Sequence, residues 1–238
     1  MSKKVIVGGF TVRSFRGLDE ASRTLISGGF RFALAVNPEK VMMARRQARL
    51  ASLLAKADFC YPDGVGVVWA MKKKGLFGSR RIPGAELWLE VLRCCEERGE
   101  SAYFLGARRE VLDSALSKLA EEFPKLHLAG SRDGFFREKD EATIMREITD
   151  SSARFVCVAL GSPKQELFIE KAIKECPGVL FMGLGGSFDV YTGSVRRAPA
   201  LFRTMGLEWF YRLLRQPGRI FRQAVLLKFV WLVIRGKL

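Results

Sequence analysis

Several residue patterns that would assign a common chemistry are missing from this sequence. It contains one histidine, His127, and no spaced cluster of cysteines and histidines, so a zinc site is not expected. A Gly-x-Ser-x-Gly elbow and a Walker A motif are both absent. No Gly-x-Gly-x-x-Gly loop and no Asp-x-Asp metal clamp is present either. We therefore expect no bound metal and no cofactor, with any phosphate held by arginines and helix N-termini.

Long apolar runs are also missing. The longest stretch, AVLLKFVWLVI, has 11 residues including one lysine, well short of the ~20 residues that span a bilayer. No apolar leader follows the first methionine, so secretion is not expected. The five cysteines are odd in number, lack Cys-x-x-Cys spacing and mostly lie in apolar runs, which is typical of buried, reduced thiols in a cytoplasmic protein.

Acidic residues are scarce at the C-terminal end. The chain carries a formal charge of +15, and its segment 196–238 holds ten Lys and Arg residues against one acid, Glu208. This charge predicts an anionic partner. The composition alone does not distinguish between nucleic acid, an anionic membrane surface and a phosphorylated substrate.

Short runs rich in β-forming residues alternate with longer helical patterns, which predicts stacked βαβ units. Strands are expected at 31–36, 58–61, 101–106, 125–130, 154–160 and 178–185, and helices at about 38–57, 65–74, 84–98, 108–122, 140–150 and 163–175. The predicted fold class is α/β, a Rossmann-like, doubly wound, mostly parallel six-stranded sheet with a small strand or hairpin at residues 4–15 near its edge. Residues 1–195 would form this core. Residues 196–238 would form a basic, amphipathic helical appendage of two helices, at 200–216 and 218–235.

Polar residues follow the predicted strands, at the sheet edge where doubly wound folds bind ligands. They are Asn37, Asp63, Gly106, Ser162 with Gln165, and Gly186 with Asp189, and the loop RRIPGAEL adds Arg81. Each also has a purely structural interpretation: Asn37 and Ser162 as helix caps, with Gln165 completing a capping box, and Asp63 and Asp189 as turn residues. Their convergence on one edge favours a binding site.

Six motifs occur in order along the chain: NPEKV, YPDGVGVV, RIPGAEL, ALGSPKQE, GLGGSFDVYTGSVRRAP and GLEWFYRLLRQPGRIFRQ. Together they resemble the WecG/TagA/CpsF family of bacterial glycosyltransferases, from about residue 31 to residue 223. The resemblance implies an inverting, metal-independent transfer of a sugar from a UDP-sugar donor. The implied acceptor is N-acetylglucosamine on undecaprenyl diphosphate, and the implied sugar is N-acetylmannosamine or N-acetylmannosaminuronic acid. Other members of the family build capsule or exopolysaccharide, so another sugar such as glucose is the alternative.

The resemblance also implies residue roles. Asp63 would be the general base, and we expect its pocket either to raise its pKa or to align it closely with the acceptor hydroxyl. Arg212, Arg219 and Arg222 would close over the site and stabilise the leaving diphosphate. The substrate-binding positions would be Asn37, Arg81, Gly106, Gly161, Ser162, Gln165, Gly186 and Asp189. One departure is Ala35, which stands where the family usually has threonine and removes a hydroxyl from the expected pocket.

The C-terminal segment combines arginines with aromatic residues such as Trp209, Phe210 and Trp231. This mixture fits a helix lying in an anionic membrane interface, so we expect a cytoplasmic protein associated with the inner face of the cell membrane. Two alternatives stay open. One is a nucleic-acid-binding module, although no recognised nucleic-acid motif is present and we expect no such partner. The other makes the segment the interface of a homo-oligomer.

Overall fold

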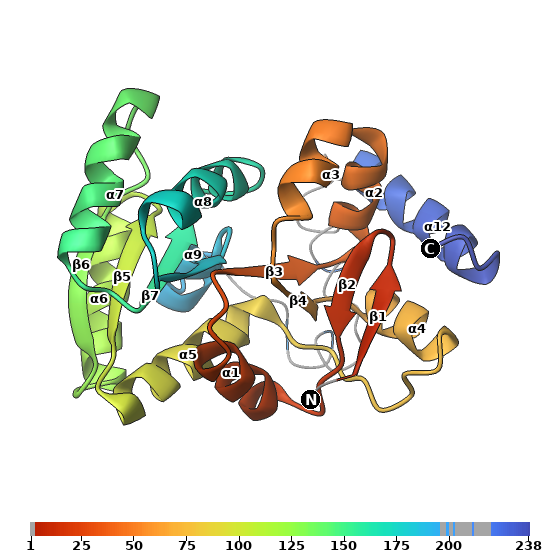
Figure 1. Cartoon of the computed structure of the whole chain (residues 1–238), viewed down its shortest axis with the longest axis horizontal. Helices are drawn as coiled ribbons and strands as arrows, with labels where there is room; N and C mark the ends of the chain where they lie inside the picture. Colours follow the sequence, from red (N-terminus) through yellow and green to blue (C-terminus); the bar gives the residue numbers. More distant parts are fainter. Residues whose placement is uncertain (1–2, 196–198, 200–201, 203–210, 212–219) are drawn as a thin grey trace.

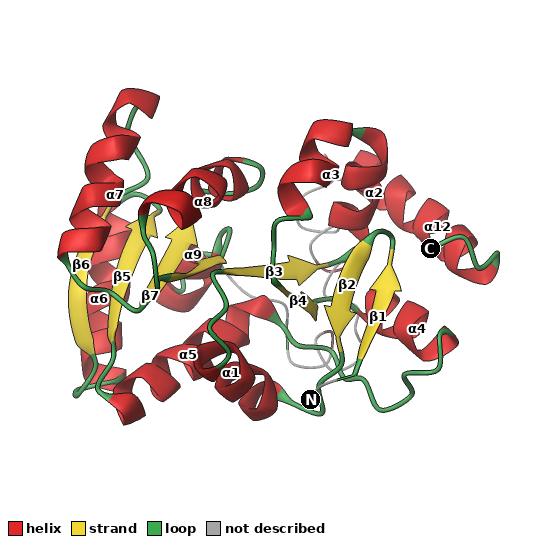
Figure 2. Cartoon of the chain, in the orientation of Figure 1, coloured by secondary structure: helices red, strands yellow, loops and turns green. Residues whose placement is uncertain are grey.

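A computed structural model describes residues 3–195, 199, 202, 211 and 220–238, without the side chains of residues 220–224. Its centre is an eight-stranded sheet with the order β1-β2-β4-β3-β8-β7-β5-β6 (Figures 1 and 2). The strands are β1 (Lys4–Val7), β2 (Phe10–Arg13), β3 (Phe32–Val36), β4 (Phe59–Pro62), β5 (Ser101–Gly106), β6 (His127–Arg132), β7 (Phe155–Ala159) and β8 (Leu180–Gly183). Only β1 and β2 pair antiparallel, and every other pairing is parallel.

The six predicted strands are all present, but the predicted count of six is wrong. The hairpin at the N-terminus supplies two further strands, and β2 joins the sheet by pairing with β4 through Val12 and Cys60. Five of the six were recognisable because a parallel sheet covered on both faces needs nearly continuous apolar strands, whereas β6 is a half-buried edge strand. The hairpin alternates buried and exposed residues, as an edge element does, and therefore resembles an accessory to the sheet more than a part of it.

Helices cover both faces of the sheet. One face carries α2 (Pro38–Arg46), α3 (Ala48–Leu54), α4 (Val65–Lys73), α7 (Glu141–Asp150), α8 (Lys164–Glu175) and α12 (Ile220–Ile234). The other carries α1 (Leu18–Ser27), α5 (Gly84–Arg98), α6 (Arg109–Glu122) and α9 (Ser187–Thr192). Each face buries its own apolar cluster against the sheet, which is the arrangement expected of a doubly wound fold.

The helix predicted at 38–57 is divided into two. Gln47 has extended backbone angles (φ −133°, ψ 101°) and separates α2 from α3. Two helices were not predicted, α1 and α9. In α1 the buried positions Ala21, Ser22, Leu25 and Ile26 follow helical spacing, but a serine among them weakens the apolar pattern.

The C-terminal helix α12 packs on α2 and α4. Phe229, Leu232 and Val233 are buried in the apolar cluster of that face of the sheet. The predicted separate appendage is therefore not confirmed for this helix, although the predicted helix at 218–235 is present as α12. The predicted helix at 200–216 falls almost wholly outside the described residues. Among the described helices, none has both the length and the apolar character needed to cross a membrane.

All five cysteines are buried free thiols, as predicted. Burial raises the pKa of both the Cys60 and the Cys95 thiol to about 12. These thiols therefore stay protonated at neutral pH and serve as small apolar side chains in the core.

Candidate active site

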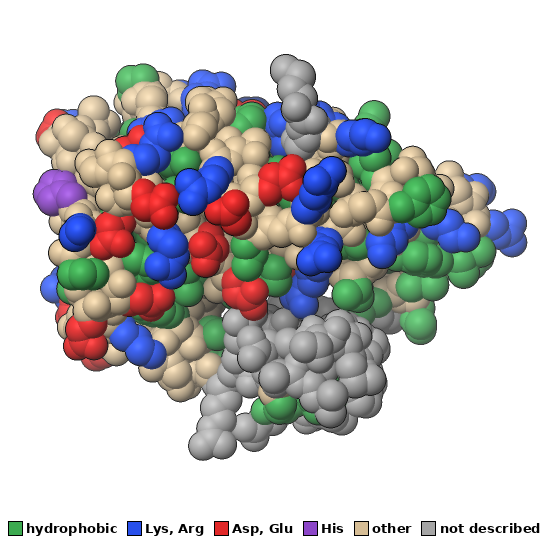
Figure 3. Space-filling model, turned by 90° about the horizontal axis from the view of Figure 1, so that it is seen from below, with side chains coloured by type: hydrophobic (Ala, Val, Ile, Leu, Met, Phe, Trp, Pro, Cys, Tyr) green, Lys and Arg blue, Asp and Glu red, His purple; other side chains and the backbone are tan. Residues whose placement is uncertain are grey.

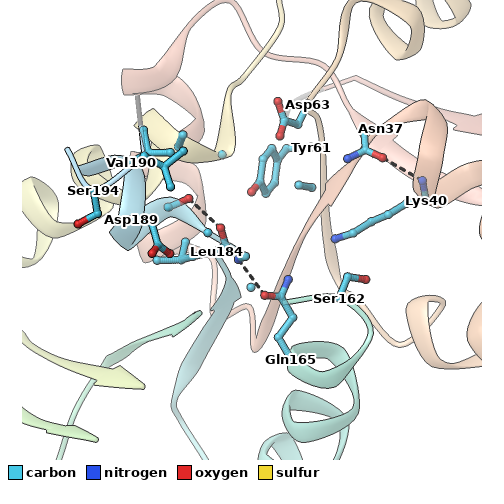
Figure 4. A pocket seen from close by; sticks show the side chains of 18 of the residues that line it. Asn37, Lys40, Tyr61, Asp63, Ser162, Gln165, Leu184, Asp189, Val190 and Ser194 are labelled. Atoms are coloured by element: carbon cyan, nitrogen blue, oxygen red, sulfur yellow. Dashed lines mark hydrogen bonds between the residues drawn. The ribbon is translucent and has the colours of Figure 1, made fainter. Parts of the chain in front are cut away.

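A cavity of about 870 Å³ opens at the carboxyl ends of four neighbouring strands, β4, β3, β8 and β7 (Figure 4). Among the described residues it is lined by Ala35, Asn37, Lys40, Tyr61, Asp63, Gly84, Ala85, Ser162, Gln165, Gly183–Ser187, Asp189, Val190, Ser194, Val195 and Tyr211. Six of the predicted site residues are in this set: Asn37, Asp63, Ser162, Gln165, Gly186 and Asp189. Parallel strands thus bring together side chains that lie far apart in the sequence.

Asp63 lies directly after β4, where the chain turns into α4. Its backbone N–H donates to the carbonyl of Val36 at 2.9 Å, which fixes the turn against the end of β3. Its Oδ1 lies 3.5 Å from Nη2 of Arg81, and both side chains are about three-quarters buried. The turn interpretation of Asp63 is therefore right, and the same turn also presents the carboxylate to the cavity.

Arg81 reaches this carboxylate from the loop before α5. The next residue, Ile82, donates its N–H to the carbonyl of Pro62 at 2.9 Å, so the loop is held beside the end of β4. Arg81 does not line the cavity itself, but its guanidinium orients the carboxylate that does.

Tyr61 is a cavity residue that was not predicted. Its side chain is fully buried, and its hydroxyl has no hydrogen-bond partner among the described residues. Burial, and to a smaller extent the Asp63 carboxylate, hold the pKa of this phenol well above its usual value, so the hydroxyl remains a donor at neutral pH. A Cβ at Gly84 would lie 2.9 Å from this oxygen, which explains why α5 begins with glycine.

Lys40, which lines the cavity, belongs to a buried ion pair. Nζ of Lys40 lies 3.0 Å from Oε1 of Glu166, and the two side chains are 12% and 1% exposed. Gln165 donates to the same Oε1 at 3.0 Å and accepts the N–H of Gly185 at 2.8 Å. This network joins the starts of α2 and α8 to the loop after β8. A Cβ at Gly183 would lie 2.5 Å from Nε2 of Gln165, so a larger residue here would displace the Gln165 side chain from these contacts.

Helix starts surround the cavity. Asn37 caps α2, its Oδ1 accepting the N–H of Lys40 at 2.9 Å, as predicted. The predicted capping box of α8 is wrong: Pro163 is the residue before the helix, no side chain caps it, and Gln165 makes the contacts just described. Ser162 lies exposed at the rim beside the start of α8, which no side chain caps. The N-terminus of a helix favours an anion.

On the opposite side, the cavity is bounded by the loop after β8 and by α9. Gly186 precedes α9, and Asp189 lies in its first turn (Figure 4). Helix α9 is anchored because Trp88 of α5 contacts the rings of both Phe188 and Tyr191. The Asp189 carbonyl also accepts the N–H of Val195 at 2.9 Å, which returns the chain to the cavity rim.

Gly106 and Gly161 are not among the described residues that line the cavity, and their role in substrate binding stays a prediction. At Gly106 the backbone geometry itself requires glycine. It has φ +124° at the end of β5, where a Cβ would lie 2.4 Å from the carbonyl oxygen of Ala159. The close approach of two backbones therefore requires glycine.

We expect Gly106→Ala to lower the free energy of unfolding by about 2–3 kcal/mol, because the side chain adds a backbone clash to an unfavourable φ. Gly178→Ala is the matched control, since Gly178 also has positive φ (+77°) but open space around its Cβ position. Urea unfolding followed by circular dichroism measures both. Equal losses would show that the contact with Ala159 is unimportant.

The three predicted catalytic arginines are not placed. Arg212 and Arg219 lie outside the described residues, and Arg222 belongs to α12 without a described side chain. Tyr211, the residue before Arg212, does line the cavity.

Among the cavity residues that sequence reasoning missed, Lys40, Tyr61 and Gly84 contribute most to the contacts described above. Lys40 could have been found, because it lies one turn after Asn37 in the motif NPEKV. Tyr61 is an apolar strand residue by pattern, and Gly84 only starts a helix, so neither carried a distinct signal.

Residues 9–238 match the glycosyl transferase WecG/TagA/CpsF family, which extends the resemblance noted at residues 31–223 to nearly the whole chain. The chain belongs to this family, and it is therefore a glycosyltransferase of cell-surface polysaccharide synthesis.

Proposed function

We propose that this protein is an inverting, metal-independent glycosyltransferase. It would move N-acetylmannosamine, or a related sugar such as N-acetylmannosaminuronic acid, from a UDP-sugar to N-acetylglucosamine linked to undecaprenyl diphosphate. The product would enter teichoic acid or another cell-surface polysaccharide. The observation that carries the proposal is the carboxylate of Asp63, oriented by Arg81 at 3.5 Å on the rim of the cavity.

In the proposed reaction the acceptor hydroxyl attacks the anomeric carbon of the donor from the face opposite UDP. The new C–O bond forms as the bond to the UDP oxygen breaks, and the hydroxyl proton passes to Asp63. Single displacement inverts the anomeric centre. The carboxylate therefore has to face the acceptor, while the diphosphate has to lie on the other side of the sugar.

The leaving diphosphate needs positive charge opposite Asp63. The start of α8 supports this placement, because no side chain caps it and Ser162 beside it lines the cavity, so the positive end of this helix lies near the rim. We propose Arg212, Arg219 and Arg222 as the cations that complete the diphosphate site. Tyr211 at the cavity supports the approach of this segment to the donor.

We also propose that the protein acts at the inner face of the cell membrane, where a lipid-linked acceptor is found. The support is α12, which exposes Leu227, Trp231 and Ile234 while burying Phe229 against the body. Lys228, Arg235 and Lys237 accompany these apolar side chains. Exposed aromatic and aliphatic groups with interspersed cations suit an anionic lipid interface.

A second candidate is transfer of another sugar, such as glucose, within the same family. Ala35 favours it, because this residue lines the cavity and contributes no hydroxyl where threonine is usual in the family. A donor without an N-acetyl group would need fewer polar contacts at this wall.

UDP release tests the proposal. Purified protein is given a short-chain polyprenyl-diphosphate N-acetylglucosamine and one donor at a time, with EDTA present. We expect turnover with UDP-N-acetylmannosamine or its uronic acid, undiminished by EDTA. Turnover with UDP-glucose alone would establish the second candidate. Absence of turnover with every UDP-sugar would contradict the proposed donor class. Loss of activity with EDTA would contradict the proposed metal independence.

A further inference from the structure

The loop between α4 and α5, taken together with the last two residues of α4, carries a concentrated positive charge and an exposed phenylalanine. Its sequence from residue 72 to residue 81 is KKKGLFGSRR, and the whole span 64–85 contains no acidic residue. The Phe77 side chain is 77% exposed. A second cavity, of about 510 Å³, is lined by Arg16, Lys72, Phe77, Gly78, Ser79 and Arg80. The catalytic chemistry proposed above uses none of these residues.

The loop is held in shape by its base. Oγ of Ser79 lies 2.7 Å from Oγ of Ser14, and Arg80 donates its N–H to the carbonyl of Phe15 at 2.9 Å. Ser79 is itself buried, and its N–H donates to the carbonyl of Leu76 at 3.2 Å. The base therefore fixes the tip that displays Phe77, so a partner would bind the ring with little loss of chain entropy.

The cations of this loop are available to an anionic partner. Within the described part of the chain, Lys72, Lys73, Lys74 and Arg80 form no ion pair. Arg16 adds a further guanidinium across the second cavity. A cluster of cations around an exposed aromatic ring has the composition of a peripheral membrane contact, in which the cations bind lipid phosphates and the ring enters the apolar layer.

The loop lies near the other exposed apolar face of the molecule. Helix α4, which leads into the loop, packs on α12, whose exposed face carries Leu227, Trp231 and Ile234. Figure 3 shows hydrophobic and basic side chains together at the right-hand end of the face it displays, whereas the acidic side chains in that view lie further to the left. Both elements thus belong to one end of the protein.

We propose that residues 72–80 form a second membrane contact, which binds the phosphates of anionic lipids and inserts Phe77 into the bilayer. This inference rests on the proposed lipid-linked acceptor. The loop runs directly into Arg81, which orients Asp63 at 3.5 Å. Docking of the loop therefore sets the carboxylate close to the lipid surface, where the diphosphate of the acceptor lies.

Vesicle flotation of the full chain tests this contact. The vesicles are phosphatidylcholine alone or phosphatidylcholine mixed with phosphatidylglycerol. We expect Phe77→Ala to weaken binding to the anionic vesicles about tenfold, the amount that corresponds to burial of one aromatic ring. The matched control is Phe135→Ala, because Phe135 is 78% exposed but lies in a loop after β6, away from α4. We expect no loss for the control.

A fluorescence experiment gives an independent signal. Tryptophan at position 77 (Phe77→Trp) should be quenched by brominated lipid in anionic vesicles, and tryptophan at position 135 (Phe135→Trp) should not. Unchanged flotation of Phe77→Ala, or equal effects at the two positions, would overturn the proposal. So would a Phe77-dependent dimer in sedimentation without any effect on vesicles, or equally tight, Phe77-dependent binding to random DNA.

Activity separates this inference from the proposed function. Phe77→Ala should retain turnover on a short-chain acceptor in solution and lose it on a long-chain acceptor held in vesicles. If the wild type uses no lipid-linked acceptor but still needs Phe77 to bind vesicles, the proposed function fails and the membrane contact stands. Equal losses on both acceptors would instead show that Phe77 acts through the structure of the active site.

Discussion

Replacing Asp63 by asparagine is expected to lower kcat about 10³-fold, the usual contribution of a general base. The amide has nearly the same shape as the carboxylate but cannot accept the proton of the acceptor hydroxyl. Binding of UDP should change little, because the proposed diphosphate site lies at α8 and not at the end of β4. UDP release measures turnover, and calorimetry with UDP measures binding.

Asp189→Asn is the sharpest comparison, because Asp63 and Asp189 are the two carboxylates among the described residues that line the cavity. We expect its loss to be much smaller and to fall mainly on KM. If Asp189→Asn abolishes turnover and Asp63→Asn does not, the base has been assigned to the wrong side of the cavity. If both variants lose UDP binding, neither result reports on the base.

The sequence was sufficient to predict the sheet edge at which these residues meet. Apolar runs fixed the strands, and in a parallel sheet the residues after each strand share one edge. Asn37, Asp63, Gln165 and Asp189 could therefore be placed together without coordinates. Gly106 shows the limit of that argument. It also follows a strand at this edge, but β5 lies beyond β7, and glycine is required there by the close approach of the Ala159 backbone.

Long-range pairings were not predictable. Nothing near Lys40 or Glu166 in the sequence indicates that the two form a buried pair, since that contact arises only when α2 and α8 pack on the same face of the sheet. The capping box at Ser162 failed for a related reason. Gln165 has the residue type and spacing to cap α8, but the N–H of Gly185 on a distant loop competes for its side chain.

Lys40→Met is expected to lower the free energy of unfolding by about 3 kcal/mol, because it leaves the Glu166 carboxylate buried without its cation. Oε1 of Glu166 would keep only the Gln165 amide, and Oε2 already has no hydrogen-bond partner among the described residues. Urea unfolding followed by circular dichroism measures the loss. Arg109→Met is the control, since Arg109 and its partner Asp113 are 63% and 50% exposed, and it should cost less than about 1 kcal/mol.

The double variant Lys40→Met with Glu166→Leu decides whether burial of the charge is the cause. An apolar pair of similar volume removes the desolvated carboxylate, so we expect most of the lost stability to return. A double variant no more stable than Lys40→Met would mean that the loss comes from packing around Lys40. The activity of the double variant carries separate information. Gln165 holds Gly185 at 2.8 Å and also donates to Glu166, so a stable but slow enzyme would show that the ion pair positions the loop after β8 for the donor.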